Sequence, residues 1–237
     1  MEIILREKPK SPIVIQGLPG IGMVGAIAAE FLIQHLDTKL IGKIILDKAP
    51  PMVALHEGKL IEPFSIYYSK KHNLLIVHSI IAVPGGEWKL ADAIASLCTD
   101  LSAKQIISLE GIGTNDESIV DSKTFFYSNS AKMEKQFRDA KLEQLREGII
   151  LGQTGALLVK ADETPVSCLF AQTHSNLPDS KAAAELIKAL DAVLDLKIDY
   201  KPLLQIAAQF EQKLKGILVQ SEKAKDMQDL KQMNYVG

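Results

Sequence analysis

The chain has 237 residues, of which 47% are hydrophobic and 24% charged, a composition typical of globular proteins long enough to bury a large core. The formal net charge of −2 argues against a nucleic-acid-binding surface, and no apolar run approaches the ~20 residues that a membrane span requires. The acidic N-terminus lacks a long apolar segment, which argues against a signal peptide. The two cysteines, Cys98 and Cys168, lie in apolar contexts. We therefore expect a cytoplasmic protein with two buried thiols and no nucleic-acid or membrane partner.

The first half of the chain alternates apolar runs with apolar residues at helical spacing. The predicted elements are, in chain order, a strand at 13–16, a glycine turn at 17–25, a helix at 26–36, a strand at 40–46, a hairpin of strands 61–68 and 74–78, and a helix at 90–101. The polar residues 70–73 give that hairpin a charged tip.

The second half continues the alternation. It predicts a strand at 106–109, a strand at 125–127, a charged helix at 131–147, apolar segments 149–152 and 156–159 flanking a glycine turn, a buried strand at 166–172 and a helix at 181–194. Such alternation indicates an α/β layered domain with a mostly parallel sheet. We expect this domain to span residues 1–199.

The strongest motif is Gly17-Leu18-Pro19-Gly20-Ile21-Gly22-Met23-Val24-Gly25. Its last three glycines match the G-x-G-x-x-G pattern that places a phosphate at a helix N-terminus, and Asp47 ends the next predicted strand, roughly where a ribose ligand is expected. One interpretation is therefore a phosphate- or nucleotide-binding protein or enzyme. The other is structural: a tight turn whose glycines let backbones or subunits approach closely.

Few other residues carry a chemical signal. Glu110 lies just past a predicted strand, where ligands bind in open α/β sheets. One interpretation is a base or a hydrogen-bond anchor for a ligand. The other is a structural carboxylate that holds neighbouring loop amides. Trp88 has two interpretations: it lines a pocket or a subunit contact, or it packs in the core. Cys168 and His174 are interpreted as a structural cysteine and a surface histidine. No two histidines have metal-ligand spacing, so we expect no metal. We also expect no catalytic residue and no cofactor.

Residues 200–237 are predicted to form a separate amphipathic helix followed by a flexible tail. The apolar stripe of this helix, suited to self-association or to a partner, consists of Leu203, Ile206, Ala207, Phe210, Leu214, Ile217 and Leu218. A polar spacer follows, and residues 233–237 are apolar again. Such an end is either a peptide ligand for a partner's pocket or a frayed terminus.

The glycine segment closely resembles the opening motif of the proteasome assembly chaperone 2 family. The resemblance continues in proline- and glycine-containing segments, namely Pro50-Pro51, Pro84-Gly85-Gly86, Leu109-Glu110-Gly111-Ile112-Gly113, and Gly148-Ile149-Ile150-Leu151-Gly152 with Gly155. It covers roughly residues 11–196. The combination is fairly specific, whereas the glycine motif alone is not. Archaeal-type members have been labelled ATP-grasp enzymes, but this chain shows no set of magnesium-binding acids beside a lysine-bearing strand.

This resemblance implies a three-layer α/β/α sandwich of the phosphorylase/hydrolase-like type, not a dinucleotide-binding fold. It also implies a non-enzymatic homo-oligomer that assembles or binds the 20S proteasome. Some relatives end in a hydrophobic residue, a tyrosine and one last residue, a tail that docks between proteasome α subunits. In this chain Tyr235 is third from last, so Val236 and Gly237 shift the match by one position.

Overall fold

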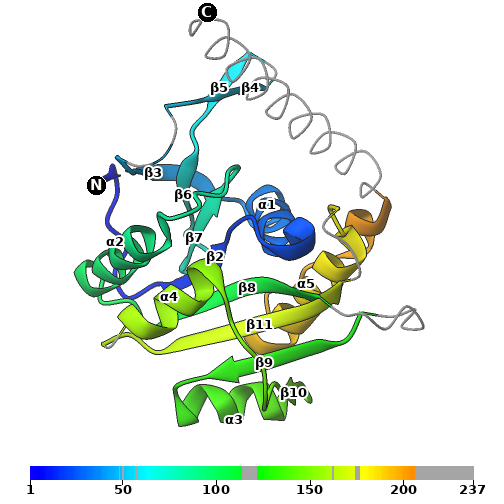
Figure 1. Ribbon diagram of the computed structural model, residues 1–237. Helices are drawn as coiled ribbons and strands as arrows, with labels where there is room; N and C mark the ends of the chain where they lie inside the picture. Colours follow the sequence, from blue (N-terminus) through cyan, green and yellow to red (C-terminus); the bar gives the residue numbers. More distant parts are fainter. Residues whose placement is uncertain are drawn as a thin grey trace, which may run out of the picture.

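Nine strands form one mixed sheet in the computed structural model, which describes residues 1–47, 49, 51–56, 58–113, 122–161, 163–173 and 177–205 (Figure 1). The strands are β1 (Glu2–Leu5), β2 (Ile13–Gly17), β3 (Lys39–Ile45), β6 (Phe64–Ser69), β7 (Leu74–Ser79), β8 (Gln105–Gly113), β9 (Thr124–Ser128), β10 (Glu143–Gln144) and β11 (Val166–Thr173). Their order across the sheet is β1-β3-β6-β7-β2-β8-β11-β9-β10.

The centre of the sheet is parallel. Strands β7, β2, β8 and β11 run side by side in one direction, and the chain passes from one side of β2 to the other between β7 and β8. All four therefore end at the same edge, which we call the carboxyl edge. The expectation of a mostly parallel sheet holds for these four strands and for the short pairing of β10 with β9. The tight turn before β7 makes β6 antiparallel, and β9 runs against β11.

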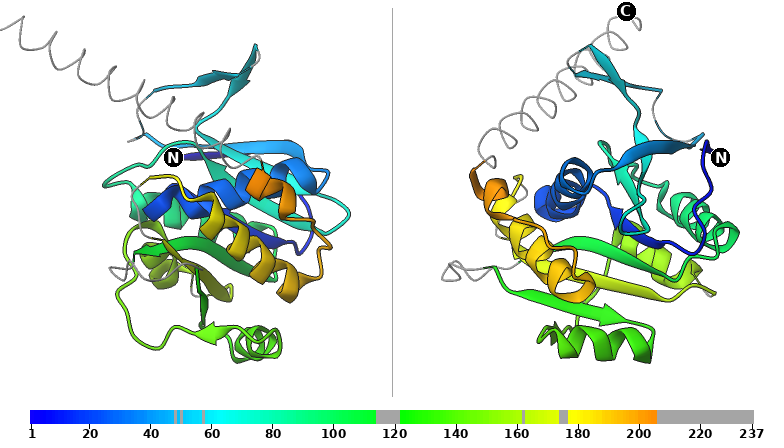
Figure 2. Two further views of the ribbon diagram at one scale, coloured as in Figure 1. Left: turned by 90° about the vertical axis from the view of Figure 1, so that its right-hand side faces the viewer. Right: turned by 180° about the vertical axis from the view of Figure 1, so that it is seen from behind.

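Helices cover both faces of the sheet, which confirms the predicted three-layer α/β/α architecture (Figure 2). On one face lie α1 (Val24–His35), α3 (Ala131–Asp139) and α5 (Ser180–Leu194). On the other lie α2 (Glu87–Asp100) and α4 (Gly152–Lys160). Because both faces are buried, the central strands are apolar along most of their length, as parallel strands usually are.

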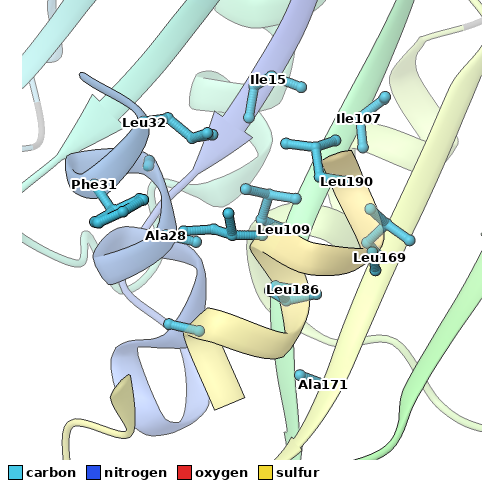
Figure 3. Close-up of a cluster of buried hydrophobic side chains, with 14 of the residues drawn as sticks. Ile15, Ala28, Phe31, Leu32, Ile107, Leu109, Leu169, Ala171, Leu186 and Leu190 are labelled. Carbon is cyan, nitrogen blue, oxygen red and sulfur yellow. The ribbon is translucent and has the colours of Figure 1, made fainter. Parts of the chain in front are cut away.

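Each helical layer closes its own hydrophobic core. Figure 3 shows the first core, where Ile15, Leu109 and Leu169 on the strands meet Leu32 of α1 and Leu186 of α5. The buried face of α5 is rich in alanine, which lets the helix lie close to its neighbours. The core can therefore be filled with few aromatic rings. Both thiols, Cys98 and Cys168, are free and buried in the second core, as the sequence predicts.

The structure differs locally from the expectations, which did not include β1. The segments 149–152 and 156–159 do not flank a glycine turn, because helix α4 spans Gly152–Lys160. The helix predicted for 131–147 ends at Asp139, ahead of the short strand β10. A hairpin of β4 (Ala54–His56) and β5 (Lys59–Ile61) was not predicted. It projects from the body of the molecule in every view of Figures 1 and 2.

The end of the described chain packs on the first core. Residues 201–205 are helical, and Leu203 is 3% exposed, packed against that core. This member of the predicted stripe is therefore used inside the chain. The other stripe residues named as partner contacts, Ile206, Phe210 and Leu214, lie outside the described residues. No helix in the described ranges is long and apolar enough to cross a membrane.

Candidate functional site at the carboxyl edge

The glycine turn lies on the carboxyl edge and packs tightly against the strand ends. It contains a short 3-10 helix, η1 (Ile21–Met23), in which Gly22 has a φ of +62°. A Cβ atom at Gly25 would collide with the carbonyl oxygen of Leu109 on β8, and one at Gly17 would collide with the backbone of Gly25. A Cβ atom at Gly20 would collide with the Glu110 carboxylate. The glycines are therefore required for close packing, as the structural interpretation expects.

A chain of hydrogen bonds beneath the turn links three elements. Gln16 Nε2 on β2 donates to Ser108 Oγ on β8 at 3.0 Å, and Ser108 Oγ lies 2.8 Å from Thr154 Oγ1 on α4. Thr154 Oγ1 donates to Glu110 Oε2 at 2.6 Å. Because Thr154 has a single hydroxyl proton, Ser108 must donate to Thr154. The whole chain therefore points its protons toward the carboxylate.

Glu110 sits at the end of that chain in an environment that favours its neutral form. Burial raises the pKa of Glu110 to about 7, although the hydrogen bond from Thr154 opposes the rise. Burial and the nearby Glu110 together raise the pKa of the Cys168 thiol, which is inert as a nucleophile in this state. At neutral pH Glu110 thus exists as a mixture of carboxylic acid and carboxylate.

The turn is also bound to α5. The amide of Asp179 donates to the carbonyl of Gly22 at 2.9 Å, and the Asp179 carboxylate caps α5 by accepting from the amide of Ala182 at 3.0 Å. The same carboxylate accepts a hydrogen bond of 2.8 Å from Thr173 Oγ1 at the end of β11. Asp179 therefore joins the turn, the last central strand and α5.

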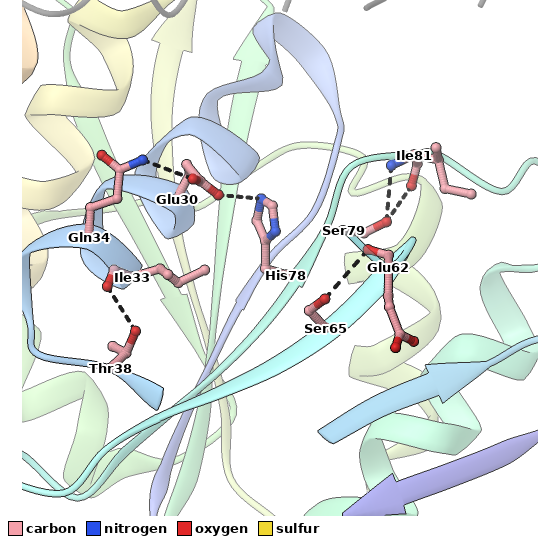
Figure 4. Close-up of polar contacts among 9 residues, drawn as sticks. All are labelled: Glu30, Ile33, Gln34, Thr38, Glu62, Ser65, His78, Ser79 and Ile81. Carbon is pink, nitrogen blue, oxygen red and sulfur yellow. Dashed lines mark hydrogen bonds and ion pairs between the residues drawn. The ribbon is translucent and has the colours of Figure 1, made fainter. Parts of the chain in front are cut away.

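A buried histidine lies beside the start of the turn. His78 on β7 pairs in register with Gly17, and its Nε2 is 3.7 Å from Glu30 Oε2 on α1 (Figure 4). Burial lowers the pKa of His78, and the Glu30 carboxylate opposes this shift only in part. We therefore assign a neutral imidazole at pH 7, held in place by α1.

The geometry does not favour the dinucleotide interpretation. Asp47 follows β3, which β6 and β7 separate from β2, and it binds the N-terminal amine at 2.8 Å. The carboxylates of Glu110 and Asp179 border the turn, an unfavourable setting for a phosphate. Among the described residues, no group of three or more His, Cys, Asp or Glu side chains is arranged to hold a metal.

A small hollow opens beside the turn. It has a volume of about 120 Å³ and is lined by Leu18, Pro19, Phe64, Ile81, Ala82, Val83, Pro84, Glu87, Leu90, Gly152 and Gln153. Pro19 is thus a wall of the hollow, together with the loop that precedes α2 and the first residues of α4. Segments with prolines and glycines that lie far apart in the sequence therefore meet here.

Exposed apolar side chains gather at this edge. Of the twelve large apolar side chains exposed in the described part of the chain, only Val159 and Leu204 lie toward the opposite edge. The other ten are Met1, Ile21, Ile45, Val53, Leu55, Leu60, Trp88, Ile149, Leu151 and Leu177. Trp88 is 54% exposed, which excludes the core role considered for it. An apolar surface of this kind is typical of a protein-binding face.

The candidate residues are thus partly brought together. Gly17, Pro19, Gly20, Gly22, Gly25 and Glu110 meet at the carboxyl edge. His174, Tyr235, Val236 and Gly237 lie outside the described residues. Sequence reasoning missed Gln16, Ser108, Thr154, His78 and Asp179. The available signal was a polar residue inside an apolar strand, as in Ile13-Val14-Ile15-Gln16 and Ile106-Ile107-Ser108-Leu109.

The chain is similar to structurally characterised archaeal proteins. Pyrococcus furiosus PbaA, described as an archaeal homolog of proteasome-assembly chaperone, is 29% identical with a TM-score of 0.83, covering 94% of this chain and 99% of PbaA. Pyrococcus furiosus PbaB, described as an archaeal proteasome activator, is 24% identical with a TM-score of 0.76, covering 91% and 98%. The latter likeness shows the fold alone.

The sequence comparisons agree. An uncharacterised protein of Methanocaldococcus jannaschii, MJ0106, is 27% identical over 213 residues, which are 89% of this chain and 87% of the relative. The model of the PAC2 family matches residues 14–218, a range that includes the glycine turn, Glu110 and the hollow. This chain therefore belongs to the PAC2 family.

Proposed function

We propose that this protein is a homo-oligomeric, non-enzymatic proteasome assembly chaperone or proteasome-binding protein. The main support is the similarity to PbaA, which extends over 94% of this chain. The carboxyl edge supports a role in protein contacts, because it carries ten exposed apolar side chains and a hollow of about 120 Å³. The partners are copies of this chain and the 20S proteasome or its α subunits.

The chemistry of the carboxyl edge is consistent with binding rather than catalysis. Glu110 forms a hydrogen bond with Thr154 within a network that joins the strands to α4. Both cysteine thiols are buried, and burial raises their pKa values. The imidazole of His78 contacts a carboxylate on a neighbouring helix. These groups hold elements together, and the glycines allow the turn to pack on the strands.

The C-terminal tail is the proposed contact with the proteasome. Its last residues, Tyr235, Val236 and Gly237, include an aromatic ring and a branched apolar side chain. A short apolar tail of this kind binds a pocket between subunits through burial of its side chains.

The test measures binding to cognate 20S proteasome by the full chain and by a chain lacking residues 233–237. Light scattering, with and without the proteasome, gives the mass of each species. We expect the shortened chain to keep the oligomeric mass and to bind at least tenfold more weakly. Tyr235→Ala is a second variant, which keeps the chain length, and it should also weaken binding. Equal affinity of all three chains would refute the role of the tail.

If the intact chain forms a discrete oligomer but does not bind the proteasome or its isolated α subunits, the proteasome part of the proposal is wrong. If the intact chain is a monomer at all concentrations, the oligomeric part is wrong. The two parts are therefore tested separately.

A further inference from the structure

The β4–β5 hairpin presents an apolar pair to solvent. Leu55 and Leu60 lie opposite each other on the two strands and are 76% and 57% exposed. The two strands pack mainly on each other, and the hairpin stands away from the body of the molecule (Figures 1 and 2). An isolated two-stranded hairpin is marginally stable in water. Such a hairpin with an exposed leucine pair gains stability when a second surface covers it.

The hollow at the glycine turn offers a surface of matching character. Its walls include Leu18, Phe64 and Ile81, and its volume of about 120 Å³ is on the scale of a cavity that holds one apolar group. Trp88 and Leu151, both exposed, directly adjoin the lining residues Glu87 and Gly152 in the sequence. The hollow is thus a small depression with mainly apolar walls, and exposed apolar residues adjoin its lining in the sequence.

Hairpin and hollow lie at the same edge of the sheet. The hairpin connects the end of β3 to the start of β6, and Phe64 at that start pairs with Ser79 at the carboxyl end of β7. Phe64 also lines the hollow. One chain therefore carries a projecting apolar element and a mainly apolar depression at the same edge. Two such elements on different parts of one surface are suited to join successive copies of the same chain.

We propose that the hairpin of one copy docks its Leu55–Leu60 pair on the hollow at the glycine turn of a second copy, with one of the two leucine side chains entering it. This inference rests on the proposed self-association and identifies its interface. The occupant is a second copy because the same chain supplies both complementary elements.

Two variants separate the two sides of this contact. Leu55→Asp with Leu60→Lys removes the apolar pair but places opposite charges across the strands, which favours the hairpin itself. Ala82→Arg places a long side chain at an exposed position in the wall of the hollow, within reach of Glu87. Val159→Asp is the matched control, because Val159 is 62% exposed but lies toward the opposite edge.

The expected masses, measured by light scattering on the full-length chains, are distinctive. Wild type and Val159→Asp form the same oligomer, whereas the hairpin variant and the hollow variant are each monomers. A mixture of the two forms a 1:1 complex of twice the 26.0 kDa chain mass, because one intact hairpin meets one intact hollow. Circular dichroism should show that all the variants keep the wild-type fold.

Any of three results would overturn the interface: the oligomeric mass persists in either variant, the mixture stays monomeric, or Val159→Asp also dissociates. Binding to 20S proteasome, measured on the same chains, separates this inference from the proposed function. If the wild type oligomerises as expected but does not bind the proteasome, the function fails and the interface stands. Loss of proteasome binding in the hairpin variant, with its oligomer intact, would instead place the proteasome on the hairpin.

Discussion

At the residue scale, Glu110 is a carboxyl group whose surroundings accommodate both protonation states. The hydroxyls of Ser108 and Thr154 can each donate in either direction along the chain of hydrogen bonds. The chain can therefore donate to a Glu110 carboxylate or accept from a Glu110 carboxylic acid. In the orientation found, Gln16 Oε1 meets no donor among the described residues. A reversed chain, with the Gln16 amide rotated, brings this oxygen to Ser108. Proton binding at Glu110 therefore costs no hydrogen bond in the chain.

The stability of the protein should depend on pH through Glu110. Its pKa is about 7 in the folded chain against an ordinary value of 4.5, so its contribution to stability is fully present below pH 4.5 and is lost as the pH rises through 7. Glu110→Gln stays neutral and still accepts from Thr154. We expect it to be more stable than wild type at pH 8, by up to about 3 kcal/mol, with no difference near pH 4.5.

Urea unfolding of both chains at pH 4.5, 6 and 8 measures this effect. The control is Glu163→Gln, since Glu163 is exposed near the opposite edge. Parallel pH profiles of wild type and Glu110→Gln would show that the folded-state pKa of Glu110 is ordinary.

The close packing of the glycine turn gives a second prediction at this scale. A methyl group at Gly25 meets the backbone carbonyl of Leu109, which cannot move away by changing a rotamer. We expect Gly25→Ala to lower the free energy of unfolding by about 1–3 kcal/mol. Gly113→Ala, at the end of β8, meets no atom of the described residues within 4 Å and should be neutral. Equal urea midpoints for the two variants would contradict the assigned packing role.

At the scale of elements, Asp179 holds the first turn of α5. Its carboxylate accepts from the Ala182 amide and from Thr173 on β11, so Asp179→Ala removes a helix cap and a strand contact together. We expect a loss of about 1–2 kcal/mol in unfolding free energy. Asp179→Asn keeps an acceptor for the amide and should lose much less. Thermal unfolding compares the two, and equal losses would show that charge, not capping, matters.

Several elements were predictable because their residues carry the information locally. The order of strand, glycine turn and helix at 13–36 follows from apolar periodicity and glycine spacing, and the three-layer fold follows from the family resemblance. Helix α4 was missed because Gly152 and Gly155 have low helix propensity, and its position depends on packing against α2 and β11. The β4–β5 hairpin was missed because it is short and its leucines do not face a core.

The polar network was beyond sequence reasoning for a different reason. Glu110 and Thr154 are 44 residues apart, and Gln16 and Ser108 are 92 apart, so only the folded sheet brings them together. The sequence analysis placed Glu110 just past a strand, whereas it lies within β8, paired with Phe170, and nothing in the sequence indicated its hydrogen-bond partner. The interpretation of the turn as a packing device rests on the close approach of Gly25 to the Leu109 carbonyl, a contact that no spacing pattern in the sequence reveals.

At the scale of the whole molecule, the two edges of the sheet differ. The carboxyl edge holds the glycine turn, the hollow and ten exposed apolar side chains, whereas the opposite edge holds the polar turn between β6 and β7. A protein with one apolar edge is expected to associate through that edge. The first core, in turn, is closed by Leu203, two residues before the described chain ends.

These observations predict how the functions are divided along the chain. A protein ending at residue 205 keeps Leu203 and both cores, so we expect it to unfold at the same urea midpoint as the full chain. It also keeps the hairpin and the hollow and should form the same oligomer. It lacks Ile206, Phe210, Leu214 and the tail, and should not bind 20S proteasome. A chain ending at residue 232 separates the tail from the preceding residues. If the chain ending at 205 is a folded monomer, the stripe beyond residue 205 holds the copies together, and the hairpin contact alone is too weak to do so.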